Sequence, residues 1–134
     1  MGYLQQLAAV AMLGLLLFCS NVRSVPDTSV VTVLCNSGSY SEGDPFATSL
    51  AYVLQDLEGV TPKRKGYDYF NISPYPNAFA YGHAACNQSL TTSDCAACLG
   101  AAKTDMLGTC QNRIGSRSVL RDCTIRYEQY AFDD

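Results

Sequence analysis

Apolar and polar stretches alternate along the chain, and their spacing predicts its secondary structure. An uninterrupted apolar run over residues 7–19 is too short to span a bilayer. β-branched residues over 30–34 then predict a strand ending at Cys35. A helix is expected to begin at Asp44-Pro45, with aspartate as the N-cap and proline in the first helical position. Its apolar stripe, spaced three and four residues apart, comprises Phe46, Leu50, Val53, Leu54 and Leu57, and Gly59 would stop it.

The second half of the chain predicts more strands and another helix. Residues 66–73 are aromatic and β-branched, and residues 78–86 return after a turn. Residues 116–123 and 124–132 also alternate like strands. Between these pairs, Thr91 or Thr92 would cap a second helix, whose inner face would hold Cys95, Leu99, Ala102 and Met106. The predicted fold is α+β: two helices packed on an antiparallel sheet of about five strands.

A hairpin between the last two predicted strands would gather charged side chains on one side. If it turns at Asp122-Cys123, Arg117 faces Glu128 and Val119 faces Arg126 on the side away from the core. Composition alone favours an exposed salt bridge that adds little stability.

The apolar run and the charge balance predict where the protein acts. Residues 1–24 are predicted to form a secretory signal peptide cleaved after Ser24, although no Lys or Arg precedes the apolar core. Residues 25–134 would then form a single domain. Without Arg23, that domain keeps 8 of the 9 basic residues against 12 acidic ones, a formal charge of −4. It has no basic patch for nucleic acid and no second apolar run of membrane length, so we expect a secreted, apoplastic protein.

Cysteine spacing bears on the chemistry. Cys19 would leave with the signal peptide, and an even number of cysteines in a small secreted domain indicates a disulfide framework. Six cysteines allow fifteen full pairings, among which spacing alone does not choose. Zinc would need about four convergent ligands, but there is one histidine and no second CxxC motif. Cys95-x2-Cys98 lacks the βαβ context of a redox site. Structural disulfides are favoured, among Cys35, Cys86, Cys95, Cys98, Cys110 and Cys123.

Other chemistry has weaker signals. His83 lies in an apolar run, where a satisfied or half-buried strand histidine is the expected state. No hydrolase motif is present, and the scattered carboxylates argue against calcium, so no metal or cofactor is expected. Asn71-Ile-Ser73 and Asn87-Gln-Ser89 are candidate N-glycosylation sequons.

The Cys86-x8-Cys95-x2-Cys98 motif resembles the hallmark of the plant ginkbilobin-type cysteine-rich domain, which also occurs in receptor-like kinase ectodomains and plasmodesmata-located proteins. The likeness continues in order across residues 25–134, through Gly66-Tyr-Asp-Tyr69, Ala80-Tyr-Gly82, Ile114-Gly115 and Tyr127-Glu-Gln129. The resemblance implies three pairings: Cys35–Cys110, Cys86–Cys95 and Cys98–Cys123.

The resemblance also implies a function and a site. Ginkbilobin-type proteins are antifungal and bind mannose without metal, through residues that match Asn36, Arg117 and Glu128. An amide, a guanidinium and a carboxylate together suit the vicinal hydroxyls of a sugar. We therefore expect a non-enzymatic, monomeric lectin that binds mannose or mannose-containing fungal cell-wall glycans. The alternative is a non-catalytic extracellular protein-interaction module of the same fold that does not bind sugar. A redox enzyme is the third hypothesis.

Overall fold

The structure is a computed structural model that describes residues 25–134. The predicted signal peptide, residues 1–24, lies outside the described residues. Five strands, two helices and a short 3₁₀ turn follow in the order β1 (Val30–Cys35), α2 (Pro45–Val60), η1 (Thr61–Lys63), β2 (Asp68–Ile72), β3 (Tyr81–Cys86), α3 (Thr92–Thr109), β4 (Gly115–Leu120) and β5 (Cys123–Glu128).

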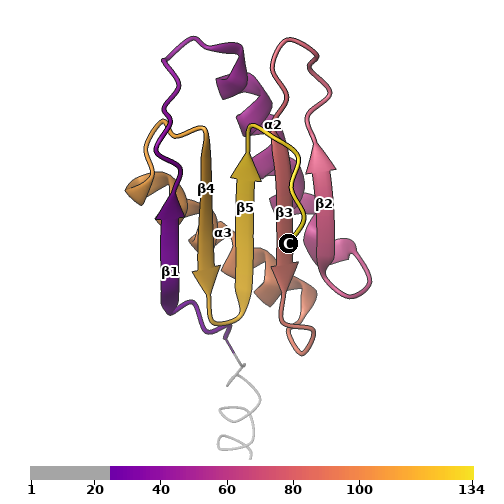
Figure 1. Ribbon diagram of the computed structural model, residues 1–134. Helices are drawn as coiled ribbons and strands as arrows, with labels where there is room; N and C mark the ends of the chain where they lie inside the picture. The colour runs from indigo at the N-terminus through magenta and orange to yellow at the C-terminus, as the bar shows by residue number, and fades with distance from the viewer. Residues whose placement is uncertain (1–24) are drawn as a thin grey trace, which may run out of the picture.

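The strands form one sheet in the order β1-β4-β5-β3-β2, and every neighbouring pair is antiparallel. Both helices cover the same side of this sheet (Figure 1). On the opposite side, called the open face below, residues 129–134 are the only described segment that crosses the sheet (Figure 1), and we call them the tail. The predicted α+β class, with two helices on a five-stranded antiparallel sheet, is confirmed.

Local signals in the sequence fix both helices. Asp44 accepts a hydrogen bond from the Phe46 amide at 2.9 Å and caps α2. Thr91 Oγ1 accepts one from the Asp94 amide at 3.1 Å and caps α3. Helix α2 ends at Val60, one residue beyond the predicted stop. Both predicted apolar stripes are buried against the sheet: Phe46, Leu50, Val53, Leu54 and Leu57 on α2, and Cys95, Leu99, Ala102 and Met106 on α3.

The three disulfides pair as the resemblance implied. Cys35–Cys110 joins the end of β1 to the end of α3, and Cys98–Cys123 joins the middle of α3 to the start of β5. Cys86–Cys95 joins the end of β3 to the first turns of α3. All three bridges tie α3 to the sheet, and a bridge of this kind typically contributes about 2–4 kcal/mol.

The predicted register of the β4–β5 hairpin is wrong by two residues. Arg117 lies opposite Arg126, not Glu128, and Glu128 lies opposite Gly115. The turn falls one residue earlier than predicted because Cys123 pairs with Cys86 on β3 and is bonded to α3, which holds it within the strand. A shift of two residues keeps every side chain on its original face. Arg117, Arg126 and Glu128 therefore still share the open face.

The end of β5 also differs from the prediction. The alternating pattern suggested a strand as far as residue 132, but β5 ends at Glu128. Glu128 is paired with Gly115, the first residue of β4, and with Tyr81, the first residue of β3. Beyond Glu128 neither neighbouring strand offers backbone for pairing, so the chain leaves the sheet there.

Candidate functional site

The three residues expected to bind sugar meet at one end of the open face. They come from the residue after β1, from β4 and from the end of β5, which are adjacent in the sheet. Together they line a pocket of about 360 Å³, called the Asn36 pocket below. Its lining consists of Leu34, Cys35, Asn36, Ser116, Arg117, Arg126, Glu128 and Tyr130.

Asn36 is held firmly by its backbone. Its amide donates to the Gly115 carbonyl at 2.8 Å, and its own carbonyl accepts from the Arg113 guanidinium at 2.8 Å. The side-chain oxygen accepts from the Gly38 amide at 3.0 Å, which fixes the orientation of the side chain. The amide nitrogen Nδ2 makes no hydrogen bond with residues 25–134, so its two donors remain for a ligand.

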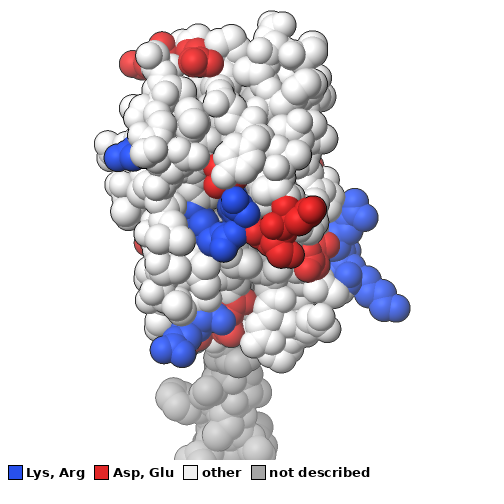
Figure 2. Space-filling model, in the orientation of Figure 1, with Lys and Arg blue, Asp and Glu red and all other residues white. Residues whose placement is uncertain are grey.

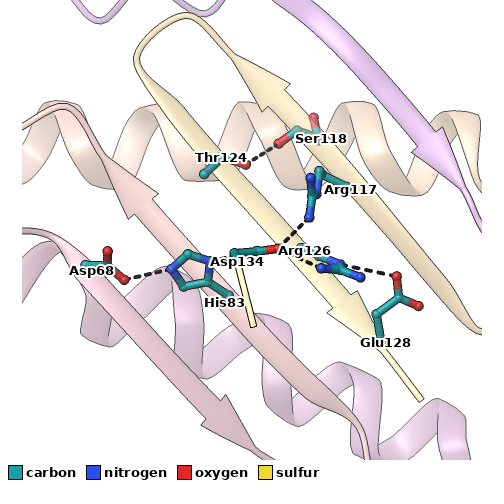
Figure 3. Close-up of polar contacts among 8 residues, drawn as sticks. All are labelled: Asp68, His83, Arg117, Ser118, Thr124, Arg126, Glu128 and Asp134. Atoms are coloured by element: carbon teal, nitrogen blue, oxygen red, sulfur yellow. Dashed lines mark hydrogen bonds and ion pairs between the residues drawn. The ribbon is translucent and has the colours of Figure 1, made fainter. Parts of the chain in front are cut away.

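Glu128 has unused capacity to accept hydrogen bonds. Its side chain is only 9% exposed, and Oε1 accepts a single bond, from Arg126 Nε at 3.3 Å (Figure 3). No donor among the described residues reaches the buried Oε2. The carboxylate fits here because Gly115 lies opposite and has no side chain. An ionised carboxylate can accept about four hydrogen bonds, so most of this capacity remains.

The two arginines share one further carboxylate, from the tail. Asp134 Oδ1 accepts from Arg117 Nη2 at 2.5 Å and from Arg126 Nη1 at 2.6 Å (Figure 3). Its other oxygen lies 2.9 Å from His83 Nδ1. Figure 2 shows the resulting group of basic side chains beside acidic ones in the middle of the open face. Arg117 lines the Asn36 pocket, and its Nε and Nη1 make no hydrogen bond with the described residues.

These contacts move two pKa values. Burial alone would raise the pKa of Asp134, but the hydrogen bonds from His83 and Arg126 and the charges of Arg117 and Arg126 outweigh it and lower that pKa below its ordinary 3.8. Burial alone would lower the pKa of Arg126, but Asp134 and Glu128 outweigh it and raise that pKa. Both groups are therefore charged at neutral pH.

His83 is a buried strand histidine whose two ring nitrogens both have hydrogen-bonding partners, the satisfied state that the sequence predicted. Its Nε2 lies 2.7 Å from Asp68 Oδ1, and its ring stacks on Phe70 with centroids 3.8 Å apart. With Asp134 on the other nitrogen, both ring nitrogens face carboxylate oxygens, and both donate only when the ring is protonated.

Sequence reasoning left Arg126, His83 and Asp134 outside the site. Strand alternation had already placed Arg126 on the same face as Arg117 and Glu128, so the sequence pattern could have included Arg126 in the site. No local signal marks Asp134, because its position depends on where β5 ends and on how the tail folds back.

Within residues 25–134, no group of three or more His, Cys, Asp or Glu side chains is arranged to hold a metal ion. None of the helices in this part of the chain is long and apolar enough to cross a membrane.

In this small α+β domain, three disulfides tie helix α3 to a five-stranded sheet, and a polar pocket lies on the side of the sheet that no helix covers. These features define a cysteine-rich module. The chain belongs to the family described as salt stress response/antifungal, which matches residues 34–130.

Two relatives support this assignment over most of their length. The chain is 38% identical over 125 residues to antifungal protein ginkbilobin-like protein 1 of Picea sitchensis, covering 92% of this chain and 93% of the relative. It is 39% identical over 108 residues to antifungal protein ginkbilobin-2 of Ginkgo biloba, covering 79% and 80%.

A solved structure shares the fold. The tandem DUF26 ectodomain of the Arabidopsis thaliana cysteine-rich receptor-like protein PDLP5 superposes with a TM-score of 0.70 at 20% identity. The match covers 78% of this chain and 51% of that one, so the chain corresponds to about half of the ectodomain.

Proposed function

We propose that this protein is a secreted, metal-independent lectin that binds mannose or mannose-containing fungal cell-wall glycans in the Asn36 pocket and acts as an antifungal defence protein. One observation carries the proposal: Asn36, Arg117 and Glu128 line one pocket, and each keeps hydrogen-bonding groups that no described residue uses. The antifungal relatives support the biological role.

The pocket chemistry suits a neutral sugar. Asn36 Nδ2 and the remaining Arg117 nitrogens donate, and Glu128 accepts, so a pair of neighbouring hydroxyls could both donate and accept. Hydrogen bonds to charged groups are the stronger kind, each contributing about 1.5–3 kcal/mol. Tyr130 lines the same pocket and offers apolar contact to a sugar ring.

Secretion is part of the proposal. Residues 1–24 would act as the signal peptide and residues 25–134 as the mature domain in the apoplast. The three disulfides support this, because such bonds form and persist in the oxidising secretory route and outside the cell.

Of the two sequons, we propose that Asn87 carries the glycan. Asn87 and Ser89 are exposed, and Asn87 Oδ1 accepts a hydrogen bond from the Ser89 hydroxyl at 3.0 Å. Asn71 points toward α2, where its Nδ2 donates to the Val53 carbonyl at 3.1 Å and to Asp56 at 3.0 Å. A glycan replaces one of the two hydrogens on this nitrogen, so at Asn71 it would break one of these two bonds, whereas Asn87 Nδ2 donates a single exposed bond, to Asp122 at 3.2 Å, and has a hydrogen to spare.

The test is a mannose titration of the mature, oxidised protein, followed by amide chemical shifts. Wild type should show saturable shifts around the pocket, and Asn36→Ala, Arg117→Ala and Glu128→Ala should each weaken binding about tenfold or more. Arg64→Ala is the matched control, because Arg64 stacks over Tyr69, away from the Asn36 pocket. Absence of saturable shifts in the wild type would refute the lectin function.

A second candidate function is an extracellular protein-interaction module. Edge strand β1 exposes three aliphatic side chains, Val30, Val31 and Leu34, each more than half exposed. Exposed apolar residues on an edge strand suit pairing with another chain. In that case partner binding would survive the three pocket substitutions and would be lost on Val31→Lys.

A further inference from the structure

The tail places the Asp134 carboxylate on the open face, where two arginines and a histidine bind it. From the end of β5 it turns and runs back over β3 (Figure 1), and Asp134 lies between the two arginines and His83 (Figure 3). The Phe132 ring lies 4.0 Å from the Arg126 guanidinium carbon and close to Phe70. The tail is therefore held by one carboxylate and one aromatic ring.

The strands alone create an electrostatic problem that this carboxylate solves. Arg117 and Arg126 lie directly opposite each other in the β4–β5 register. Like charges in that position repel and destabilise a sheet. Asp134 bridges them with two charge-assisted hydrogen bonds, and His83 holds its second oxygen. Three adjacent strands thus each contribute one group to a receptor for a carboxylate, which we call the carboxylate site.

The carboxylate site and the Asn36 pocket are continuous, because Arg117 and Arg126 belong to both. With Asp134 displaced, the two arginines would face only Glu128 within that pocket, leaving a net positive charge of about one. A neutral sugar uses only the hydroxyl-binding half of this surface. A sugar that carries a carboxylate could use both halves.

We infer that the open face binds a hexuronate, a sugar oxidised to a carboxylate at C6, and that Asp134 is the internal ligand with which it competes. The sugar carboxylate takes the place of Asp134 between Arg117 and Arg126, and its ring hydroxyls reach Asn36 and Glu128. The inference rests on the proposed sugar site, because it uses the same Asn36, Arg117 and Glu128. It adds an acidic class of sugar and a part of the chain, the tail, that competes with it.

The competition has a defined strength. Asp134 is the sixth residue after the end of β5, so the tail carboxylate is tethered at an effective concentration on the order of millimolar or higher. An external hexuronate must exceed that competition, and its apparent affinity falls by the fraction of molecules with the tail displaced. Wild type should therefore bind a free hexuronate weakly, and loss of the tail carboxylate should strengthen binding.

The experiment titrates the mature, oxidised protein with D-galacturonate and, separately, with D-galactose, which differs from it only at C6. Amide chemical shifts report binding, and the same spectra show that each variant is folded. Asp134→Asn should bind galacturonate about tenfold more tightly than wild type, with galactose binding unchanged. Asp133→Asn is the matched control: it removes the same charge from the tail, but no ion pair joins Asp133 to the arginines.

A second variant tests the receptor rather than the tail. Arg126→Gln in the Asp134→Asn background should abolish the gain, because one of the two guanidinium groups is lost while Asn36, Arg117 and Glu128 remain. The inference is overturned if Asp134→Asn leaves galacturonate binding unchanged or undetectable, or if galactose binding rises equally.

Mannose titrated into the same samples separates this inference from the proposed function. If the protein binds mannose but Asp134→Asn does not bind galacturonate more tightly, the lectin function is retained and the carboxylate site is refuted. A galacturonate response without any mannose binding would do the reverse.

Discussion

Gly115 offers a way to displace Glu128 without altering any side chain that would touch the sugar. It lies directly opposite Glu128, and a methyl group added there would overlap Oε2 and come within 2.5 Å of Cδ. Non-bonded heavy atoms of this kind settle about 3.5–4.0 Å apart, so the carboxylate must move by about 1 Å or more. In Gly115→Ala, Glu128 therefore keeps its charge but loses its place in the Asn36 pocket.

The structure sets the size of the effect. Moving the carboxylate removes the hydrogen bonds that Glu128 would make to sugar hydroxyls, a loss of about 1.5–3 kcal/mol. Mannose binding should weaken about 10- to 150-fold. Stability should change by no more than about 1 kcal/mol, because only the end of a flexible side chain moves and alanine also reduces the entropy of the unfolded chain.

Mannose titration followed by amide shifts measures the first effect, and urea unfolding measures the second. Gly108→Ala on α3 is the matched control, since an added methyl group meets nothing within 4 Å there. If Gly115→Ala binds mannose as tightly as wild type, then the position of Glu128 beside Gly115 does not matter for sugar binding, and this prediction is refuted. Loss of cooperative unfolding would refute the claim that the methyl group is absorbed locally.

Three further predictions concern stability, pH and modification. Replacing Cys35 and Cys110 by serine should cost about 4 kcal/mol in urea unfolding, because this bridge closes a 75-residue separation; a cost below about 1 kcal/mol would contradict the loop-closure argument. The lowered pKa of Asp134, caused by His83 and the arginines against the opposing effect of burial, means that its docking is complete above pH 3.8 and is lost as pH falls through its folded-state pKa. Tail amide shifts followed against pH check this, and release centred well above pH 4 would contradict it. Protein secreted from a eukaryotic host should carry a glycan that endoglycosidase removes and that Ser89→Ala abolishes; an unchanged glycan mass in Ser89→Ala would place the glycan at another site and contradict the assignment to Asn87.

Local patterns predicted the elements well because the forces that form them are local. Asp44-Pro45 and Thr91 cap their helices as the sequence indicated, and the apolar stripe from Phe46 to Leu57 faces the core. Strand alternation put Arg117 and Glu128 on the same face, and this held although the register was wrong, since a two-residue shift preserves the face.

Features that depend on neighbouring strands were not predictable in this way. The β4–β5 turn moved because Cys123 is fixed by β3 and α3. Strand β5 ended at Glu128 because its neighbours begin there, although the alternation continues beyond it. Both errors arose where tertiary partners, rather than side-chain periodicity, set the boundary.

The sequence by itself determined the α+β class, the faces of the strands and the cysteine framework, because periodicity and residue type act over a few neighbouring positions. The resemblance to known proteins implied the pairing of the cysteines and the three expected sugar-binding residues. Only the tertiary structure decided that Arg117 faces Arg126 and that Asp134 comes back to bridge them. That contact depends on the register of a hairpin and on the path of a short tail, and no local pattern encodes either.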